Sequence, residues 1–182
     1  MRISPTAQLP PWTSILISKV PYAESVKYLG MTLDSKLNWK KHLQKKKEEL
    51  NIKFRSMYWL MGRKSQLTLH NKILIYKQIL RPIWTYGIQL WGCTKKTNAK
   101  IIQTYQNKVL RSIVNAPWYM RNDDIHRDLK METVGETIAK FARKHQRRLL
   151  KHKNPEMSNV LNNKNELRRL KRNKPSDLVV LC

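Results

Sequence analysis

Residues 122–124 (NDD) contain two adjacent carboxylates, Asp123 and Asp124, of the kind that hold Mg²⁺ in phosphoryl-transfer enzymes. They stand in a polar segment between Arg121 and Ile125, where a helix cap or a turn is a commoner use of aspartate. None of the five histidines lies at ligand spacing from a partner residue. We therefore predict no metal site and no cofactor bound by this chain.

A second candidate site is the segment 126–130 (HRDLK), whose first four residues match the start of a protein-kinase catalytic loop. In that loop the aspartate, here Asp128, accepts the proton of the attacking hydroxyl. Thr133 stands where the kinase loop needs an asparagine, and neither a glycine-rich phosphate loop nor a downstream Asp-Phe-Gly occurs. We predict a short helical turn capped by Asp124, and no catalytic residues in the chain.

The net charge points to a polyanionic partner. The 182 residues include 37 Lys and Arg against 12 Asp and Glu, a formal net charge of +25. Self-repulsion at this charge weakens the compact state unless a partner neutralises it, and nucleic acid is the usual partner of so basic a domain. An anionic membrane surface is the alternative partner for a chain of this charge. The 41% of apolar residues can fill a core, so the chain is not a disordered tail.

Cysteine usage and hydropathy indicate where the protein works. Cys93 and Cys182 are too few for a disulfide framework, and neither has a Cys or His at zinc spacing. No apolar run reaches membrane-spanning length, and the prolines at 5, 10 and 11 interrupt any signal-peptide core. We expect an intracellular protein, located in the nucleus, with no membrane partner.

The elements that would carry these residues begin with two strands. Residues 12–18 are rich in isoleucine, and residues 26–33 alternate apolar and polar side chains, so we predict a hairpin with its turn through Pro21. Gly30 marks a bulge or a close backbone approach. An isolated hairpin is marginal in water, so we expect these strands to come from a larger sheet whose other strands precede residue 1.

The rest of the chain reads as helices. Asp34 and Ser35 are cap residues before one apolar stripe over residues 39–61, and a second stripe over residues 69–80 ends where Pro82 starts a new helix. Helix 98–115 follows, and residues 133–136 (TVGE) form a capping box for a further helix. Residues 154–182 read as a flexible basic tail with one short helix at 166–171.

Segment 81–92 (RPIWTYGIQLWG) looks like the hub of this helical core. Two tryptophans and a tyrosine fall within twelve residues, and aromatic side chains of this size dominate core energetics. A packing elbow between helices explains the segment better than any chemistry. We predict six aromatic core anchors: Trp39, Trp59, Trp84, Tyr86, Trp91 and Trp118.

Several segments together resemble reverse transcriptases of non-LTR retrotransposons. Residues 26–34 (VKYLGMTLD), 37–39 (LNW) and His42 are similar to the last palm strand and the helix that follows it. Residues 57–65 (MYWLMGRKS), 81–92 and 108–119 (KVLRSIVNAPWY) resemble thumb segments of the jockey group of insect elements, and residues 125–129 (IHRDL) resemble a further block. The resemblance spans residues 26–150.

This resemblance implies a division of labour. In the family a Tyr-x-Asp-Asp turn on the palm holds Mg²⁺ for nucleotide addition, and this sequence has no such turn, so the chain alone is expected to be inactive. The resemblance makes Tyr28, Leu29 and Gly30 a primer-grip-like strand, and it makes the helical bundle a thumb that holds the RNA–DNA template-primer duplex. A thumb must hold a duplex of any sequence, and contacts from Lys and Arg to the phosphates do not depend on the bases. The cations expected to make them are Lys40, Lys41, Lys45, Lys47, Arg55, Arg63, Lys64, Lys108, Arg111, Arg147 and Arg148.

The expected fold is therefore mainly α, an α+β fragment. Residues 1–36 are the end of a palm sheet with the primer-grip-like hairpin, residues 37–153 a helical thumb-like domain, and residues 154–182 the basic tail. The expected function is template-primer binding within an RNA-directed DNA polymerase, whose upstream palm and fingers are further partners. Two alternatives stay open: a stand-alone basic nucleic-acid-binding module, and a non-functional relic of a retrotransposon.

Overall fold

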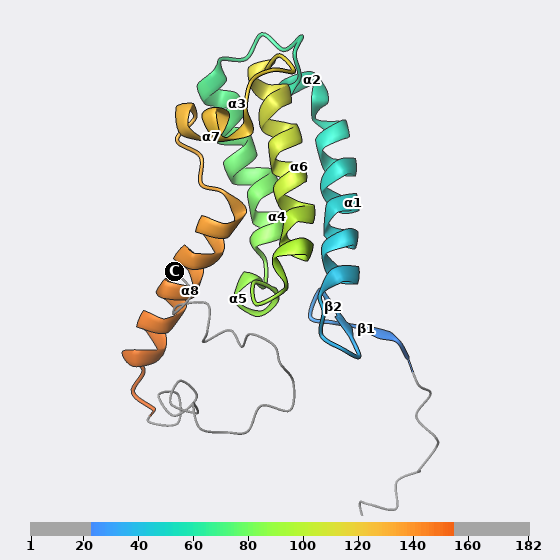
Figure 1. Cartoon of the computed structure of the whole chain (residues 1–182), viewed down its shortest axis with the longest axis vertical. Helices are drawn as coiled ribbons and strands as arrows, with labels where there is room; N and C mark the ends of the chain where they lie inside the picture. The colour runs from blue at the N-terminus through green and yellow to red at the C-terminus, as the bar shows by residue number, and fades with distance from the viewer. Residues whose placement is uncertain (1–22, 155–182) are drawn as a thin grey trace, which may run out of the picture.

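A two-stranded hairpin leads into a bundle of helices in the computed structural model, which describes residues 23–154 (Figure 1). The mainly helical fold with one short β-hairpin is confirmed. The expected strand 12–18 and tail helix 166–171 lie outside the described residues. The elements are β1 (Ser25–Tyr28), β2 (Met31–Asp34), α1 (Lys40–Ser56), α2 (Tyr58–Met61), α3 (Leu69–Ile75), the π-helical turn η2 (Tyr76–Leu80), α4 (Arg81–Thr85), α5 (Ile88–Trp91), α6 (Lys96–Val114), α7 (Asn122–Asp128) and α8 (Val134–Leu150).

The hairpin differs from the one that the sequence predicted. β1 and β2 pair with each other, Tyr28 opposite Met31, so residues 26–33 are both arms of a hairpin rather than one strand. The turn consists of Leu29 (φ 45°) and Gly30 (φ 74°), and two positive φ values in succession are what a type I′ turn requires. Gly30 therefore makes the turn and no bulge. The alternation misled the prediction because a two-residue turn does not interrupt it.

Side chains of the helices fix the hairpin to the bundle. The backbone N–H of Thr32 donates to Nδ1 of His42 on α1 (3.2 Å), and the hydroxyl of Tyr86 donates to the carbonyl oxygen of Leu29 (2.8 Å). Gly87 (φ 65°) lies so close to the sulfur of Met31 that a Cβ there would clash with it. At Gly30, by contrast, the nearest atoms belong to the Tyr86 ring, so the predicted close approach of another backbone is not found there.

Asp34 links β2 to α1, but neither it nor Ser35 is the cap residue that the sequence predicted, because the N-cap of α1 is Trp39. The two carboxylate oxygens of Asp34 accept the backbone N–H groups of Asn38 (2.8 Å) and Trp39 (3.0 Å). Trp39 adopts a left-handed conformation (φ 62°), and α1 begins at the next residue. These two bonds satisfy N–H groups ahead of the first helical turn.

The helix break predicted at Pro82 does not occur. α3 runs through the π-helical turn η2 directly into α4, with Pro82 in the first turn of α4. Proline removes one backbone donor, and a π-helical turn shifts the hydrogen-bond pattern by one residue, so the chain passes the proline without leaving the helix. The break comes instead at Tyr86, whose backbone is extended, and at the left-handed Gly87.

The core lies where α1, α4 and α6 meet (Figure 1). Trp84 and Trp91 are fully buried and pack edge to face with ring centroids 6.5 Å apart. The hydroxyl of Tyr105 on α6 donates to the carbonyl oxygen of Leu50 on α1 (3.0 Å), and burial raises the pKa of this tyrosine. Trp39 is also buried. Three of the six expected anchors therefore hold the bundle together.

The other three expected anchors are on the surface, so their assignment to the core was wrong. Trp59 is 74% exposed, Tyr86 53% and Trp118 91%. The apolar stripe continues past the end of α1 through the buried Met57 and Met61, and Trp59 lies two residues from each of them, on the opposite side of the turn. Trp118 lies in the loop after α6, where no helical period applies, and Tyr86 instead uses its hydroxyl to hold the hairpin.

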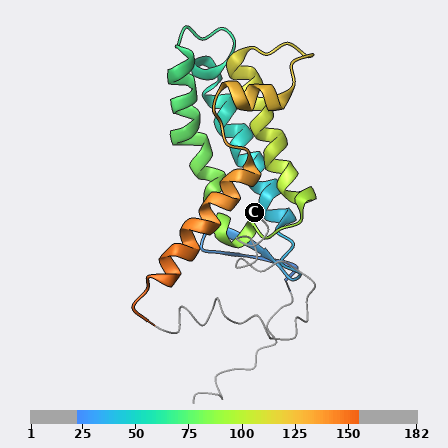
Figure 2. The same cartoon turned by 60° about the vertical axis from the view of Figure 1, so that its left-hand side comes forward.

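α8 crosses the bundle obliquely and ends away from it (Figure 2). It begins with the predicted capping box: the Thr133 hydroxyl accepts the Glu136 N–H, and the Glu136 carboxylate accepts the Thr133 N–H. Glu132, just before it, pairs with Arg81 of α4 and Lys140 of α8. The hydrogen bond from Lys140, followed by that from Arg81, lowers the pKa of Glu132.

Candidate nucleic-acid interface

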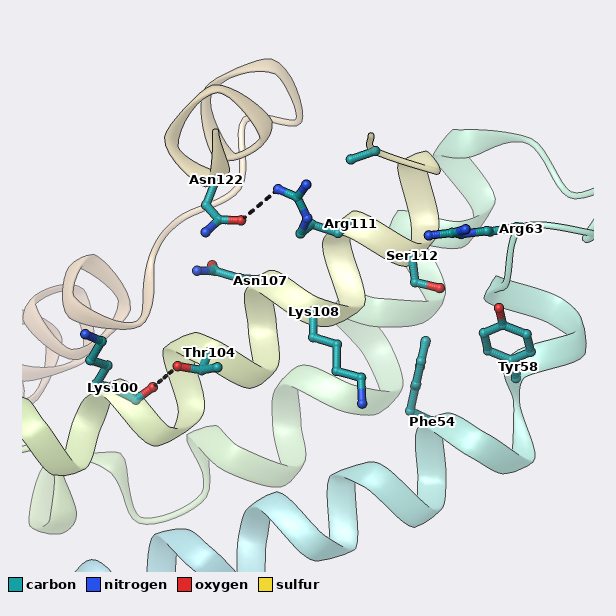
Figure 3. Close-up of a pocket in the computed structure, with 11 residues that line it drawn as sticks. Phe54, Tyr58, Arg63, Lys100, Thr104, Asn107, Lys108, Arg111, Ser112 and Asn122 are labelled. Carbon is teal, nitrogen blue, oxygen red and sulfur yellow. Dashed lines mark hydrogen bonds between the residues drawn. The ribbon is translucent and has the colours of Figure 1, made fainter. Parts of the chain in front are cut away.

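A pocket of about 710 Å³ opens between the end of α1, α2, one face of α6 and the start of α7 (Figure 3). The α6 side of the pocket repeats at helical spacing, with positions 100, 104, 107, 108, 111 and 112 on one face. Phe54 and Tyr58, whose rings pack edge to face, form the wall contributed by α1 and α2. The α6 side of the pocket is thus largely polar, and the side formed by α1 and α2 is aromatic.

Three exposed cations surround this pocket. Arg63 and Lys100 lie at opposite ends, and Lys108 extends from α6 toward α1 between them (Figure 3). Within residues 23–154, none of these three forms an ion pair with a carboxylate. Such an array attracts phosphate groups, because its charges are not neutralised within the described protein. Arg63 and Lys108 were predicted, whereas Lys100 was missed although its spacing of eight from Lys108 places it on the same helix face.

Arg111 has a structural role that the sequence did not reveal. Its guanidinium donates to the carbonyl oxygens of Pro117 (2.5 Å) and Met120 (2.7 Å) and to Oδ1 of Asn122 (3.2 Å). It therefore holds the loop between α6 and α7 in place at the edge of the pocket. Its charge still adds to the positive potential of the pocket, but both terminal nitrogens of its guanidinium already donate within the protein.

The predicted cations of α1 point in different directions. Lys47 lies seven residues before Phe54 and so shares its side of the helix, whereas Lys45 lies nine residues before it, about half a turn away. Lys41 is paired with Glu24 (2.7 Å). Lys40, Lys45, Lys47 and Arg55 are exposed.

The other predicted sites lie apart from the pocket. Arg147 and Arg148 are exposed on α8, which packs on α5 and α6 rather than on α1. Lys64 is exposed beside Arg63 in the loop before α3. Tyr28 and Leu29 are exposed at the turn of the hairpin with Gly30. Tyr28 ends β1, and Leu29 and Gly30 form the turn that follows, so the primer-grip role of these three residues stays a prediction.

The kinase-like segment 126–130 packs α7 against α6. His126 is buried on α7, with Nδ1 2.9 Å from the carbonyl oxygen of Met131 and Nε2 2.9 Å from Oδ1 of Asn107 on α6. Asp124 pairs with Arg127 one helical turn later. Among residues 23–154, no three His, Cys, Asp or Glu side chains cluster as metal ligands would. These residues brace α7 against α6.

The fold and surface define a mainly helical bundle with a hairpin at one end and a basic pocket at the other, a design suited to a polyanionic ligand. In the described part of the chain, no helix is long and apolar enough to cross a bilayer. No family model matches the sequence, and no solved structure matches it.

Comparison with known proteins shows its relatives. The chain is 42% identical over 170 residues, 93% of its length, to the probable RNA-directed DNA polymerase from transposon X-element of Drosophila melanogaster. It is 37% identical over 87% of its length to the RNA-directed DNA polymerase from mobile element jockey of the same species, and 34% identical over 93% to that of Drosophila funebris. The resemblance to jockey-group reverse transcriptases is therefore confirmed, and the chain is homologous to one segment of these polymerases.

That segment is a small part of each relative. The chain spans 14% to 19% of the length of the curated relatives it matches. The homology therefore describes a fragment of such a polymerase.

Proposed function

We propose that this chain binds the template-primer duplex within an RNA-directed DNA polymerase of a non-LTR retrotransposon. The observation that carries the proposal is the pocket with Arg63, Lys100 and Lys108 on a segment homologous to such polymerases. Phosphate contacts by Lys and Arg do not depend on base sequence, so they suit a surface along which a duplex moves.

The chemistry of nucleotide addition is proposed to lie in other parts of the parent polymerase. The Mg²⁺ that the family implies needs clustered carboxylates, and Asp123 is exposed while Asp124 is paired with Arg127. These residues do not fit the ion, so we derive no step through it. We expect no primer extension by the purified chain on a primed RNA template, and extension would contradict this assignment.

A competition experiment tests the proposal. The chain would be bound to a labelled recessed RNA–DNA hybrid and challenged with unlabelled hybrid, single strands, or heparin of matched charge. We expect the hybrid to compete best, because the pocket and α6 present cations at fixed spacing to a duplex backbone. Removing residues 155–182 provides the control, and the preference should survive it.

Equal competition by every polyanion would overturn the proposal. So would affinity that resides in residues 155–182 alone. Either result would favour a stand-alone basic binding module, which the net charge of +25 also permits.

A further inference from the structure

The loop between α6 and α7 carries two large aromatic side chains that are exposed to solvent. Trp118 is 91% exposed and Tyr119 72% exposed, with ring centroids 6.0 Å apart and planes at 82°. A single exposed apolar residue is normal on a protein surface. Two adjacent exposed aromatic rings in one turn form an apolar patch of the kind that marks a binding site.

This aromatic turn, residues 117–120, is held rigidly. The backbone N–H of Met120 donates to the carbonyl oxygen of Pro117 (3.2 Å), and Arg111 donates to both of those residues' carbonyl oxygens. Before the turn, Asn115 ends α6 in a left-handed conformation (φ 51°). The rings are therefore presented by a fixed backbone, and binding through them would cost little ordering entropy.

The aromatic turn adjoins the basic pocket. Ala116 and Asn122, on either side of the turn, both line the pocket that Arg63 and Lys108 surround (Figure 3 shows Asn122 bonded to Arg111). Arg121, directly after the turn, is exposed. Positive charge beside exposed rings matches a ligand that has both phosphates and flat apolar faces.

We propose that the aromatic turn stacks unpaired bases of a nucleic-acid strand where that strand leaves the duplex. The inference deepens the proposed function and rests on it: the pocket cations hold phosphates, and Trp118 and Tyr119 receive the bases that no longer pair. Within the duplex, paired bases keep their faces covered by their neighbours, whereas unpaired bases beyond its end have faces free to stack on these rings. Stacking accepts any base, which fits an enzyme that copies any sequence.

The test uses an RNA–DNA hybrid with a short single-stranded extension, and the same hybrid whose extension is abasic. The Trp118→Ala/Tyr119→Ala double variant should bind the base-bearing extension about tenfold more weakly for each base that stacks. It should bind the abasic hybrid as the parent chain does. Trp118→Phe should restore most of the binding, since an aromatic face remains.

Trp59→Ala is the matched control, because Trp59 is 74% exposed but lies on α2 outside the turn. It should leave binding of the extension unchanged. Equal losses for Trp59→Ala and the double variant would overturn the proposal, as would equal losses on base-bearing and abasic extensions. Displacement of the hybrid by anionic vesicles from the parent chain but not from the double variant would make the turn a membrane contact and also overturn it.

A blunt hybrid separates this inference from the proposed function. If the parent chain binds blunt hybrid no better than heparin, duplex binding fails, whatever the abasic comparison shows. If blunt hybrid is preferred but base-bearing and abasic extensions bind alike, only the stacking inference fails.

Discussion

His42 couples the hairpin to the bundle through a bond that requires a neutral ring. Its Nδ1 accepts from the Thr32 N–H, which protonation of Nδ1 would prevent. Burial of the ring, and then the charge of Lys46, lower the pKa of His42 below 6.5. In the unfolded chain the ring titrates near its ordinary value. Between the two pKa values the unfolded chain binds more protons than the folded protein, so stability falls as pH falls below about 6.5.

We expect the urea midpoint of unfolding to be flat above about pH 6.5 and to decline toward pH 5. His42→Asn is the matched variant, because an amide oxygen can accept from Thr32 but does not titrate. Its midpoint should change much less over the same range. An identical decline in both proteins would assign the effect to other groups.

Buried and exposed tryptophans give a second prediction at this scale. Trp91 is fully buried against Trp84, and its Nε1 donates to the carbonyl oxygen of Tyr86 (3.1 Å). Trp91→Ala should cost about 3 to 5 kcal/mol of unfolding free energy. Trp59→Ala, at an exposed position, should stay within about 0.5 kcal/mol of the parent. Urea titration followed by circular dichroism measures both, and similar losses would contradict the burial described here.

Sequence reasoning identified Trp84 and Trp91 correctly and misplaced Trp59 and Trp118 for a physical reason. The two buried rings lie on α4 and α5, on either side of the break at Tyr86 and Gly87, in the segment whose density of large aromatic side chains predicted the hub of the core. Trp59 lies between Met57 and Met61, off the apolar stripe that these two buried residues continue, and Trp118 lies in a turn fixed by Arg111. The turn at Trp118 does not follow from the spacing of apolar residues, because a hydrogen bond to a loop carbonyl leaves no periodic signal.

The hairpin turn is the element that the sequence least determined. A type I′ turn favours Asn-Gly, and here Leu29 occupies the first position with φ 45°, which a leucine adopts reluctantly. We expect Leu29→Asn to stabilise the protein by about 1 kcal/mol. Thermal unfolding of the variant should therefore have a higher midpoint than that of the parent.

Gly30→Ala is the opposing control for this turn. Its φ of 74° disfavours a side chain, and a Cβ would lie 3.4 Å from the Tyr86 ring. We expect it to lower the midpoint by an amount similar to the gain from Leu29→Asn. If Leu29→Asn is neutral or destabilising, the Leu29 side chain makes a contact that outweighs the backbone strain.

The helices were easier to predict than their junctions. Residues 98–115 carry a helical period and residues 133–136 a capping box, and α6 and α8 agree with them closely. The junction at Pro82 carried only a breaker residue. Whether a proline ends a helix depends on the pattern of hydrogen bonds around it, and in the π-helical turn before Pro82 both Tyr76 and Leu80 are buried in the core.

At the scale of the whole molecule, the cations do not form one surface. Lys100 and Lys108 share a face of α6 at the pocket, while Arg147 and Arg148 lie on α8, which contributes no residue to the pocket. The sequence predicted that the positive charge binds a polyanion. It could not predict which cations lie on a common surface, because that depends on the relative orientation of α6 and α8. The net charge alone attracts any polyanion, whereas only one group of cations can follow a given duplex.

Two charge-matched double variants separate these groups by salt dependence. The logarithm of the affinity for a blunt RNA–DNA hybrid should fall linearly with the logarithm of salt concentration, with a slope that counts the phosphate contacts. Lys100→Ala/Lys108→Ala should lower that slope by about two units, one for each lysine that no longer neutralises a phosphate. Arg147→Ala/Arg148→Ala removes the same charge and should change the slope less. Equal reductions would show that net charge, and not the pocket on α6, determines how this protein holds nucleic acid.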